Sequence, residues 1–296
     1  RDGGNASSVH GTGRAARARV EAARRAVAAL IGARAENVLF VGSGTEANNQ
    51  VLRCTGCTDL VISAIEHESV MLARSDAAVL PVLQEGVIDL DALENMLAER
   101  TEPTLVSIMM ANNETGIVQP VAEIARIAHA KGALVHTDAI QAAGKIPVDM
   151  AALGVDFLSL SAHKIGGPQG VGALVCRDRS KLDRLVHGGG QESGLRAGTE
   201  NVAGITGFGV AARCAADGLA DFMALAGLRD SLEQRLSNIV PGQTVFGAGL
   251  ARLPNTCKVA TPGLSSEVQV MGLDLAGIAI SAGSACAAGR VEAPYV

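Results

Sequence analysis

A lysine follows an apolar run in the segment 159–168, which reads Ser-Leu-Ser-Ala-His-Lys-Ile-Gly-Gly-Pro. The amine of Lys164 can form a Schiff base with a carbonyl compound. The hydroxyl of Ser161 and the imidazole of His163 are possible phosphate ligands beside it. A lone lysine after a strand is more often a solvated surface residue. The functional interpretation of Lys164 therefore depends on whether other segments of the chain supply groups for the same site.

A carboxylate ends another apolar run, because Asp138 follows Val135-His-Thr and precedes Gln141. Open α/β sheets bind their ligands beyond the carboxyl ends of the strands. Asp138 could there pair with a protonated ring nitrogen. An aspartate that caps a helix explains this residue equally well.

A glycine-rich turn, Gly42-Ser-Gly44-Thr45-Glu46, lies between a predicted strand and a predicted helix. Free N–H groups and the helix dipole at such a turn can hold a phosphate. The spacing matches neither the P-loop nor the dinucleotide fingerprint. A tight turn without a ligand remains the alternative.

One of the six cysteines, Cys286, lies among small residues with a glycine on either side. This setting favours it as the nucleophile, although a buried or incidental thiol fits the local sequence as well, since reactivity depends on pKa and exposure. The pair Cys54 and Cys57 has C-x-x-C spacing but no second ligand pair nearby. We therefore expect two structural thiols there rather than a redox or zinc site, and no disulfide framework.

The composition is that of a globular protein, with 296 residues, 48% of them hydrophobic, and a net charge of −5. No basic stretch or aromatic platform indicates nucleic acid as a partner. Neither a membrane-spanning run nor a secretory signal is evident, so we expect a cytoplasmic protein without a membrane partner. The chain starts at Arg1 and stops at Val296, directly after a motif-like stretch, and we expect it to be incomplete at both ends.

Short apolar runs alternate with helical patterns, which predicts an α/β fold with a mostly parallel sheet flanked by helices. We expect strands at 38–41, 60–64, 79–83, 105–110, 133–137, 157–161 and 171–176, and helices at 13–31, from 45, from 66 and at 121–131. Beyond the glycine-dense stretch 188–198 we expect long helices at 200–216 and 219–240. Short strands at 255–260 and 277–281 then favour a smaller second domain. The predicted division is 1–217 and 218–296.

In their order along the chain, these segments resemble the cysteine desulfurases, a branch of the class V aminotransferase-like enzymes with the type I pyridoxal-phosphate fold. Further segments carry the same resemblance, namely 5–10, 13–17, Glu66-His67 and Asn112-Asn113-Glu114-Thr115-Gly116. The resemblance implies a large cofactor-binding domain and a smaller α+β C-terminal domain that bears the cysteine loop.

The resemblance also implies roles for the site residues. Lys164 would hold pyridoxal 5′-phosphate as a Schiff base, Asp138 would keep its pyridine nitrogen protonated, and Gln141 would hydrogen-bond its phenolic oxygen. His67 would stack on the ring and move protons, and the alternative for His67 is a histidine that only caps a helix. The remaining cofactor ligands would be Asn113 and the phosphate-binding set Gly44, Thr45, Ser161, His163 and Thr199, the last from the second subunit of a homodimer.

The implied reaction moves sulfur from L-cysteine to Cys286 as a persulfide and releases L-alanine, for delivery to a sulfur acceptor or an iron–sulfur scaffold protein. No metal site is expected, apart from a transient contact of Cys286 with an iron–sulfur cluster. Two features depart from the family: Ala6 replaces a proline, and the arginine that grips the substrate carboxylate falls beyond Val296. A selenocysteine lyase, an aminotransferase, or a silent partner in sulfur transfer are the alternatives.

Overall fold

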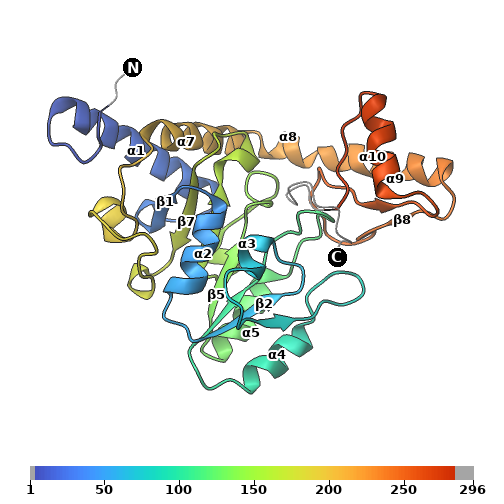
Figure 1. The fold of residues 1–296 in the computed structure, drawn as a ribbon, viewed down its shortest axis with the longest axis horizontal. Helices are drawn as coiled ribbons and strands as arrows, with labels where there is room; N and C mark the ends of the chain where they lie inside the picture. Colours follow the sequence, from blue (N-terminus) through green and yellow to red (C-terminus); the bar gives the residue numbers. More distant parts are fainter. Residues whose placement is uncertain (1–3, 284–296) are drawn as a thin grey trace.

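The computed structural model describes residues 4–283, and a seven-stranded sheet in the order β1-β7-β6-β5-β4-β2-β3 forms its centre (Figure 1). Six strands run parallel to one another, and β7 runs antiparallel between β1 and β6. The strands are β1 Val38–Val41, β2 Asp59–Ser63, β3 Ala78–Leu80, β4 Thr104–Ser107, β5 Leu134–Asp138, β6 Phe157–Ser161 and β7 Gly172–Cys176. The predicted fold class is confirmed.

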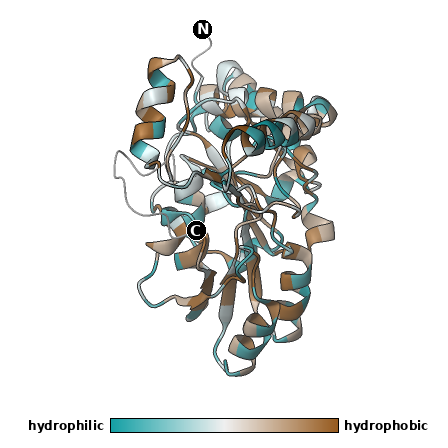
Figure 2. Ribbon diagram, turned by 90° about the vertical axis from the view of Figure 1, so that its right-hand side faces the viewer, coloured by the Kyte–Doolittle hydropathy of each residue, from teal (hydrophilic) through white to brown (hydrophobic). Residues whose placement is uncertain are grey.

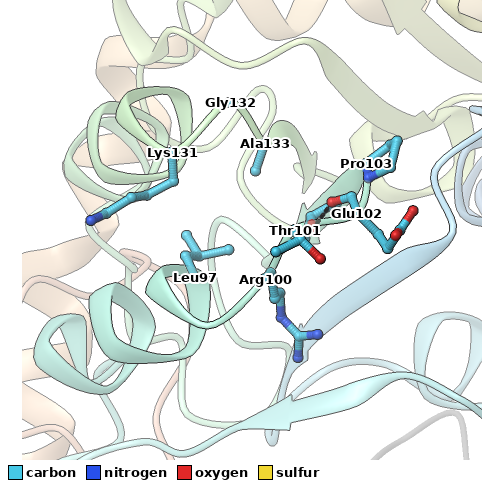
Figure 3. A pocket seen from close by; sticks show the side chains of 9 residues that line it. Leu97, Arg100, Thr101, Glu102, Pro103, Lys131, Gly132 and Ala133 are labelled. Carbon is cyan, nitrogen blue, oxygen red and sulfur yellow. Dashed lines mark hydrogen bonds between the residues drawn. The ribbon is translucent and has the colours of Figure 1, made fainter.

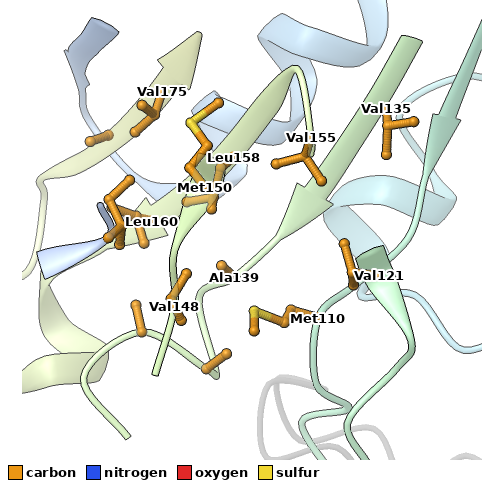
Figure 4. Packing of buried hydrophobic residues seen from close by; sticks show 14 of the residues in the cluster. Met110, Val121, Val135, Ala139, Val148, Met150, Val155, Leu158, Leu160 and Val175 are labelled. Atoms are coloured by element: carbon orange, nitrogen blue, oxygen red, sulfur yellow. The ribbon is translucent and has the colours of Figure 1, made fainter. Parts of the chain in front are cut away.

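Both faces of the sheet are buried, which is why its strands read as nearly continuous apolar runs. Alternate residues of β1 enter different layers: Val38 and Phe40 lie in one hydrophobic cluster, Leu39 and Val41 in the other. Figure 4 shows the larger cluster, where Leu158 of β6 packs among its neighbours. In Figure 2 the central strands are mostly coloured as apolar residues, whereas the surrounding helices mix apolar and polar ones. The sheet is therefore a rigid platform whose strand ends can hold a site.

Helices cover the two faces unequally. The larger cluster takes side chains from α1 Gly11–Leu30, α4 Leu90–Ala98, α5 Val121–Ala130, α6 Met150–Leu153 and α7 Val202–Asp217. The smaller cluster takes them from α2 Gly44–Cys54 and α3 Glu68–Met71. Helices α1 and α7 cross closely, because Gly209 lies where a Cβ would meet Ala23 Cα at 2.5 Å. A larger residue at 209 would push the two helices apart.

The chain then leaves the sheet through α8 Leu219–Met223, α9 Leu225–Ile239, the two-stranded β8 Thr244–Val245 and β9 Val259–Ala260, and α10 Ser266–Leu275 (Figure 1). Neither α9 nor α10 has a fully buried residue. No helix among residues 4–283 is long and apolar enough to cross a membrane.

The structure confirms all seven predicted strands of the main sheet within a few residues. It corrects four other predictions. The helix expected at 219–240 is two helices that meet at Ala224, the helix from 66 is a single turn, and only the end of 255–260 is a strand. The strand expected at 277–281 is wrong: Ile278 and Ile280 are exposed, and no neighbouring strand pairs with them in the described chain. An apolar run forms a strand only where a partner supplies hydrogen bonds.

Candidate active site

A cavity of about 290 Å³ opens at the carboxyl ends of the parallel strands. All the parallel strands except β3 contribute to the cavity wall, either through their last residue or through the loop that follows them. The antiparallel β7 contributes no residue, since its carboxyl end points the other way. The lining is Ser43, Gly44, Thr45, His67, Ser69, Met109, Ala111, Asn113, Asp138, Ile140, Gln141, Ser161, His163 and Lys164.

The N-terminus of α2 forms one end of the cavity. The Ser43 hydroxyl caps this helix by accepting a hydrogen bond from the N–H of Glu46 at 3.1 Å. A Cβ at Gly44 would lie 2.2 Å from Ile140 Cδ1, so a larger residue there would displace the Ile140 side chain that lines the cavity. Helix N-termini attract anions, so this end suits a phosphate. The structure confirms the tight turn, and phosphate binding there stays a prediction.

Ser161 and His163 stand beside this helix end, with the Ser161 hydroxyl 2.8 Å from His163 Nδ1. Burial, and then the nearby Lys164, lower the pKa of His163 below its ordinary value. A neutral imidazole next to a hydroxyl can serve a phosphate as a hydrogen-bond partner. Lys164 itself is half-buried in the short 3-10 helix Ala162–Ile165, directly after β6, and lines the cavity.

Asp138 ends β5 with its side chain 6% exposed in the cavity wall. Its carboxylate accepts hydrogen bonds from Asn48 Nδ2 at 2.7 Å and from the N–H of Ile140 at 2.9 Å. Burial raises the pKa of Asp138, and those two hydrogen bonds oppose the rise, as do His67 and Lys164. A cation in the cavity would therefore stabilise the ionised carboxylate. The Ile140 contact closes a turn, but no helix begins at Asp138, so the helix-capping alternative is wrong.

His67 caps α3 and lines the cavity at the same time. Its Nδ1 accepts the backbone N–H of Ser69 at 3.1 Å and lies 2.9 Å from the Ser69 hydroxyl. A backbone N–H can only donate, so the neutral ring carries its proton on Nε2. Asn48 Nδ2 also donates to the Ser69 hydroxyl at 2.9 Å. A continuous chain of hydrogen bonds thus links Asp138 to His67.

The sequence analysis gave no role to two residues of this network, Asn48 and Ser69, nor to the buried Glu66, which precedes His67. Asn48 is fully buried and follows Gly44 by one helical turn, a spacing that could have placed it on the cavity side of α2. The buried Glu66 carboxylate accepts the Ser63 hydroxyl at 2.5 Å and the N–H of Met109 at 2.8 Å. Burial raises the pKa of Glu66 to about 8, so this carboxyl is mostly protonated at neutral pH.

Cys286, the predicted nucleophile, lies outside the described residues. Thr199 is exposed and does not line the cavity. The loop before it is held firmly, because the buried Glu192 accepts hydrogen bonds from two nitrogens of Arg24 at 2.7 and 2.8 Å. Arg196, nearer to Thr199, donates to Glu46 at 2.9 Å.

The remaining cysteines bear on the C-x-x-C interpretation. Cys54, Cys57, Cys176, Cys214 and Cys257 are free thiols. Partial burial raises the pKa of both Cys54 and Cys57, which disfavours their thiolates and agrees with the structural interpretation. Among the residues described, no group of histidine, cysteine and acidic side chains is arranged to hold a metal ion.

A second hollow, of about 320 Å³, lies at the opposite ends of the strands (Figure 3). Its wall includes Arg100, Glu102 and Thr104 before and at the start of β4, and Lys131 after α5. Arg100 donates to Asp59 at 3.0 Å. Charged side chains at this end are exposed or paired with one another, and the hollow has none of the predicted site residues.

Comparison with known proteins places this arrangement in a class. The family model described as "Aminotransferase class-V" matches residues 2–294. A cysteine desulfurase of Cereibacter sphaeroides is 46% identical over 99% of this chain and 78% of its own length. The X-ray structure of a NifS-like protein from Rickettsia africae superposes with a TM-score of 0.90 at 37% identity, over 95% of this chain and 80% of that one.

A third similar protein is a solved structure titled "SspA in complex with cysteine", with a TM-score of 0.80 at 30% identity over 96% of this chain and 82% of that chain. The fold and the family model define an aminotransferase of class V. Within that class, the chain belongs to the cysteine desulfurase family, whose members depend on pyridoxal 5′-phosphate.

Proposed function

We propose that this chain is a cysteine desulfurase that transfers sulfur from L-cysteine to its own Cys286 and releases L-alanine. The observation that carries the proposal is the convergence of Lys164, Asp138 and the N-terminus of α2 on one cavity. An amine, a buried carboxylate and an anion-binding helix end are the three groups that a phosphorylated pyridine aldehyde requires. The family membership supports the same activity.

The cavity suits the cofactor in size and in chemistry. Ligand cavities start at about 300 Å³, close to the volume found here. Gly44, Thr45, Ser161 and His163 would hold the phosphate, and Lys164 would bind the aldehyde carbon. Asn113 and Gln141 supply amide groups to the wall, and Gln141 would hydrogen-bond the phenolic oxygen. When bound, the cofactor supplies an electron-accepting ring.

The protein's own groups then have defined tasks. With the cofactor bound, the Asp138 carboxylate would hold a proton on the pyridine nitrogen, because two donors support its charge. His67, whose neutral ring carries its proton on Nε2, would lie against the ring and serve as an acid. The Lys164 amine would serve as the base that takes the proton from the substrate Cα.

Sulfur transfer itself is assigned to Cys286. Its thiolate forms a sulfur–sulfur bond to the substrate, and the carbon–sulfur bond breaks with its electron pair going to carbon. A proton then takes the place of sulfur on that carbon, which yields alanine. Enzyme and substrate thus end as a persulfide and an amino acid, without an external oxidant or reductant.

The proposal extends to partners. Thr199 would reach the phosphate in the second subunit of a homodimer, which agrees with its exposed position at the end of an anchored loop. A sulfur acceptor, such as an iron–sulfur scaffold protein, would collect the persulfide sulfur. A cytoplasmic location completes the proposal. Sedimentation, pull-down of labelled persulfide and cell fractionation test these three points separately.

The test of the activity begins with the visible spectrum. Purified protein supplied with pyridoxal phosphate should turn yellow, and borohydride should attach the cofactor to Lys164, as peptide mass spectrometry would show. Incubation with L-cysteine should yield alanine and a persulfide on Cys286 in equal amounts. Cys214→Ala provides the matched control for Cys286→Ala, since Cys214 is an exposed thiol on α7. Release of a keto acid in place of alanine would contradict the proposal.

A further inference from the structure

A second lysine, Lys145, lies next to the cavity without lining it. Its side chain is buried, with 8% of the residue exposed. Its Nζ donates a hydrogen bond to Gln141 Oε1 at 2.9 Å. Lys145 occupies the turn that follows β5, and Gly144, with a φ of 73°, brings the chain round just before it.

No carboxylate in the described part of the chain forms a salt bridge with Lys145. Burial, and then the charge of Lys164, lower the pKa of Lys145 to about 8. Two lysines close together, one of them buried, cost folding free energy. Buried charged groups without a partner are common at functional sites, where a bound ligand can supply the opposite charge. The phenolate and phosphate of the proposed cofactor would supply it here.

The contact with Gln141 also decides which way its carboxamide faces. An ammonium group only donates, so it can pair with Oε1 but not with Nε2. Gln141 is in the cavity wall and Lys145 is behind it, which leaves Nε2 as the arm available to the cavity. Without Lys145, the two orientations of the amide would be closer in free energy.

We propose that Lys145 is a positioning residue that holds the Gln141 carboxamide with Oε1 outward, so that Nε2 donates to the phenolic oxygen of pyridoxal phosphate. This inference rests on the proposed function and adds to it. Lys145 touches neither the cofactor nor the substrate. It acts through Gln141 and, at longer range, through its charge.

The consequence for the bound cofactor has a definite sign. A donor on the phenolic oxygen, and a positive charge near it, stabilise the form in which the nitrogen linking Lys164 to the cofactor has lost its proton. Loss of Lys145 should therefore raise the pH at which the visible absorption changes. The other titratable groups around the cavity are Lys164, Asp138, His67, His163 and Glu66.

The experiment compares Lys145→Met with Lys131→Met, an exposed lysine of the opposite hollow. In Lys145→Met we expect cofactor affinity, measured by equilibrium titration, to fall about tenfold. We expect the midpoint of the spectral change to rise by about 1 pH unit. Lys131→Met should match the wild type in both. Glu66 is present in every variant, so the difference isolates Lys145.

A double-mutant cycle with Gln141→Leu separates positioning from charge. If Lys145 acts through the amide, adding Lys145→Met to Gln141→Leu should change the affinity by less than about twofold. An equal loss in both backgrounds would overturn the inference, as would a Lys145→Met protein that binds and titrates like the wild type. A wild-type protein that binds no pyridoxal phosphate would instead overturn the proposed function.

Thermal unfolding checks that Lys145→Met is folded. If it is not, Gln141→Glu tests the step through the amide, because this variant keeps an oxygen for Lys145 and replaces the donor Nε2 with another oxygen. We expect this variant to bind the cofactor as weakly as Gln141→Leu. Wild-type affinity in Gln141→Glu would contradict the inference.

Discussion

The two hollows at opposite ends of the sheet are similar in volume, about 290 Å³ at the carboxyl ends and about 320 Å³ at the amino ends. They differ in how their polar groups are held. Asp138 at the carboxyl end is buried and receives two hydrogen bonds. At the amino end, Glu102 and Lys131 are exposed to solvent. Volume does not distinguish a site here, whereas buried and oriented charge does.

The reason is the polarity of the strands. Parallel strands deliver the loops of several βα units to one edge, together with the N-termini of the helices that follow. In this protein the loops after β1, β2, β4, β5 and β6 converge in that way. The amino edge receives loops that end helices, where the dipole repels anions. The contrast can be tested by matched substitutions at the two ends.

The largest effect is expected from Lys164→Ala. The amine is proposed both to bind the cofactor and to move the Cα proton, so alanine formation should fall on the order of 1000-fold or more. Borohydride trapping should vanish with it. Lys131→Ala is the matched change at the amino end and should retain wild-type activity. Retained turnover in Lys164→Ala would remove the distinction between the two hollows.

A smaller loss is expected from Asp138→Asn, which keeps the shape but not the charge at the pyridine nitrogen. Alanine formation should fall about 100-fold, because the ring would no longer stay protonated. Asp59→Asn at the amino end breaks only the partly exposed pair with Arg100 and should leave kcat unchanged. Equal effects of the two changes would contradict the comparison.

The third prediction concerns the pH dependence of the free energy of unfolding, through a histidine in β5. His136 is fully buried in β5, with its two ring nitrogens 2.8 Å from the Ser107 hydroxyl and 2.9 Å from the Ser159 hydroxyl. Burial lowers the pKa of His136 to about 3. The folded pKa is thus below the unfolded value, so this contribution to stability is complete above about pH 6.5 and is lost as the pH falls toward 3.

We expect the free energy of unfolding to drop by up to about 1.4 kcal/mol per pH unit in that window. Urea unfolding at pH 7.5 and pH 5 measures the drop, which should shrink in His136→Gln. His129→Gln, which changes the histidine paired with Asp156 at the amino end, is the control. The same pH dependence in wild type and His136→Gln would refute the assignment.

The smallest effect is expected at the amino-end hollow itself. Arg100→Ala removes an ion pair whose side chains are 22% and 32% exposed, so unfolding free energy should fall by only about 0.5 kcal/mol. Cofactor affinity and kcat should stay within about twofold. A large loss of either would mean that this hollow takes part in function.

Much of the fold could be predicted from the sequence. The central sheet was predictable because its strands are buried on both faces and form short, continuous apolar runs. The C-terminal part was harder to predict. Its strands have only two residues each, and its helices α9 and α10 have no buried face to produce a clear period. The division at 217 and 218 stays a prediction.

The candidate site, too, could be predicted from the sequence only in part. The sequence by itself determined which chemical groups are present and in which order. Every residue that the resemblance assigned to the cofactor, apart from Thr199, lines the cavity. Only the tertiary structure decided their contacts. Asn48 reaches Asp138 across 90 residues of chain, and Lys145 and Ser69 orient Gln141 and His67. The contact between Asn48 and Asp138 depends on strand register and helix placement, because a hydrogen bond forms only within a few tenths of an ångström of its proper length.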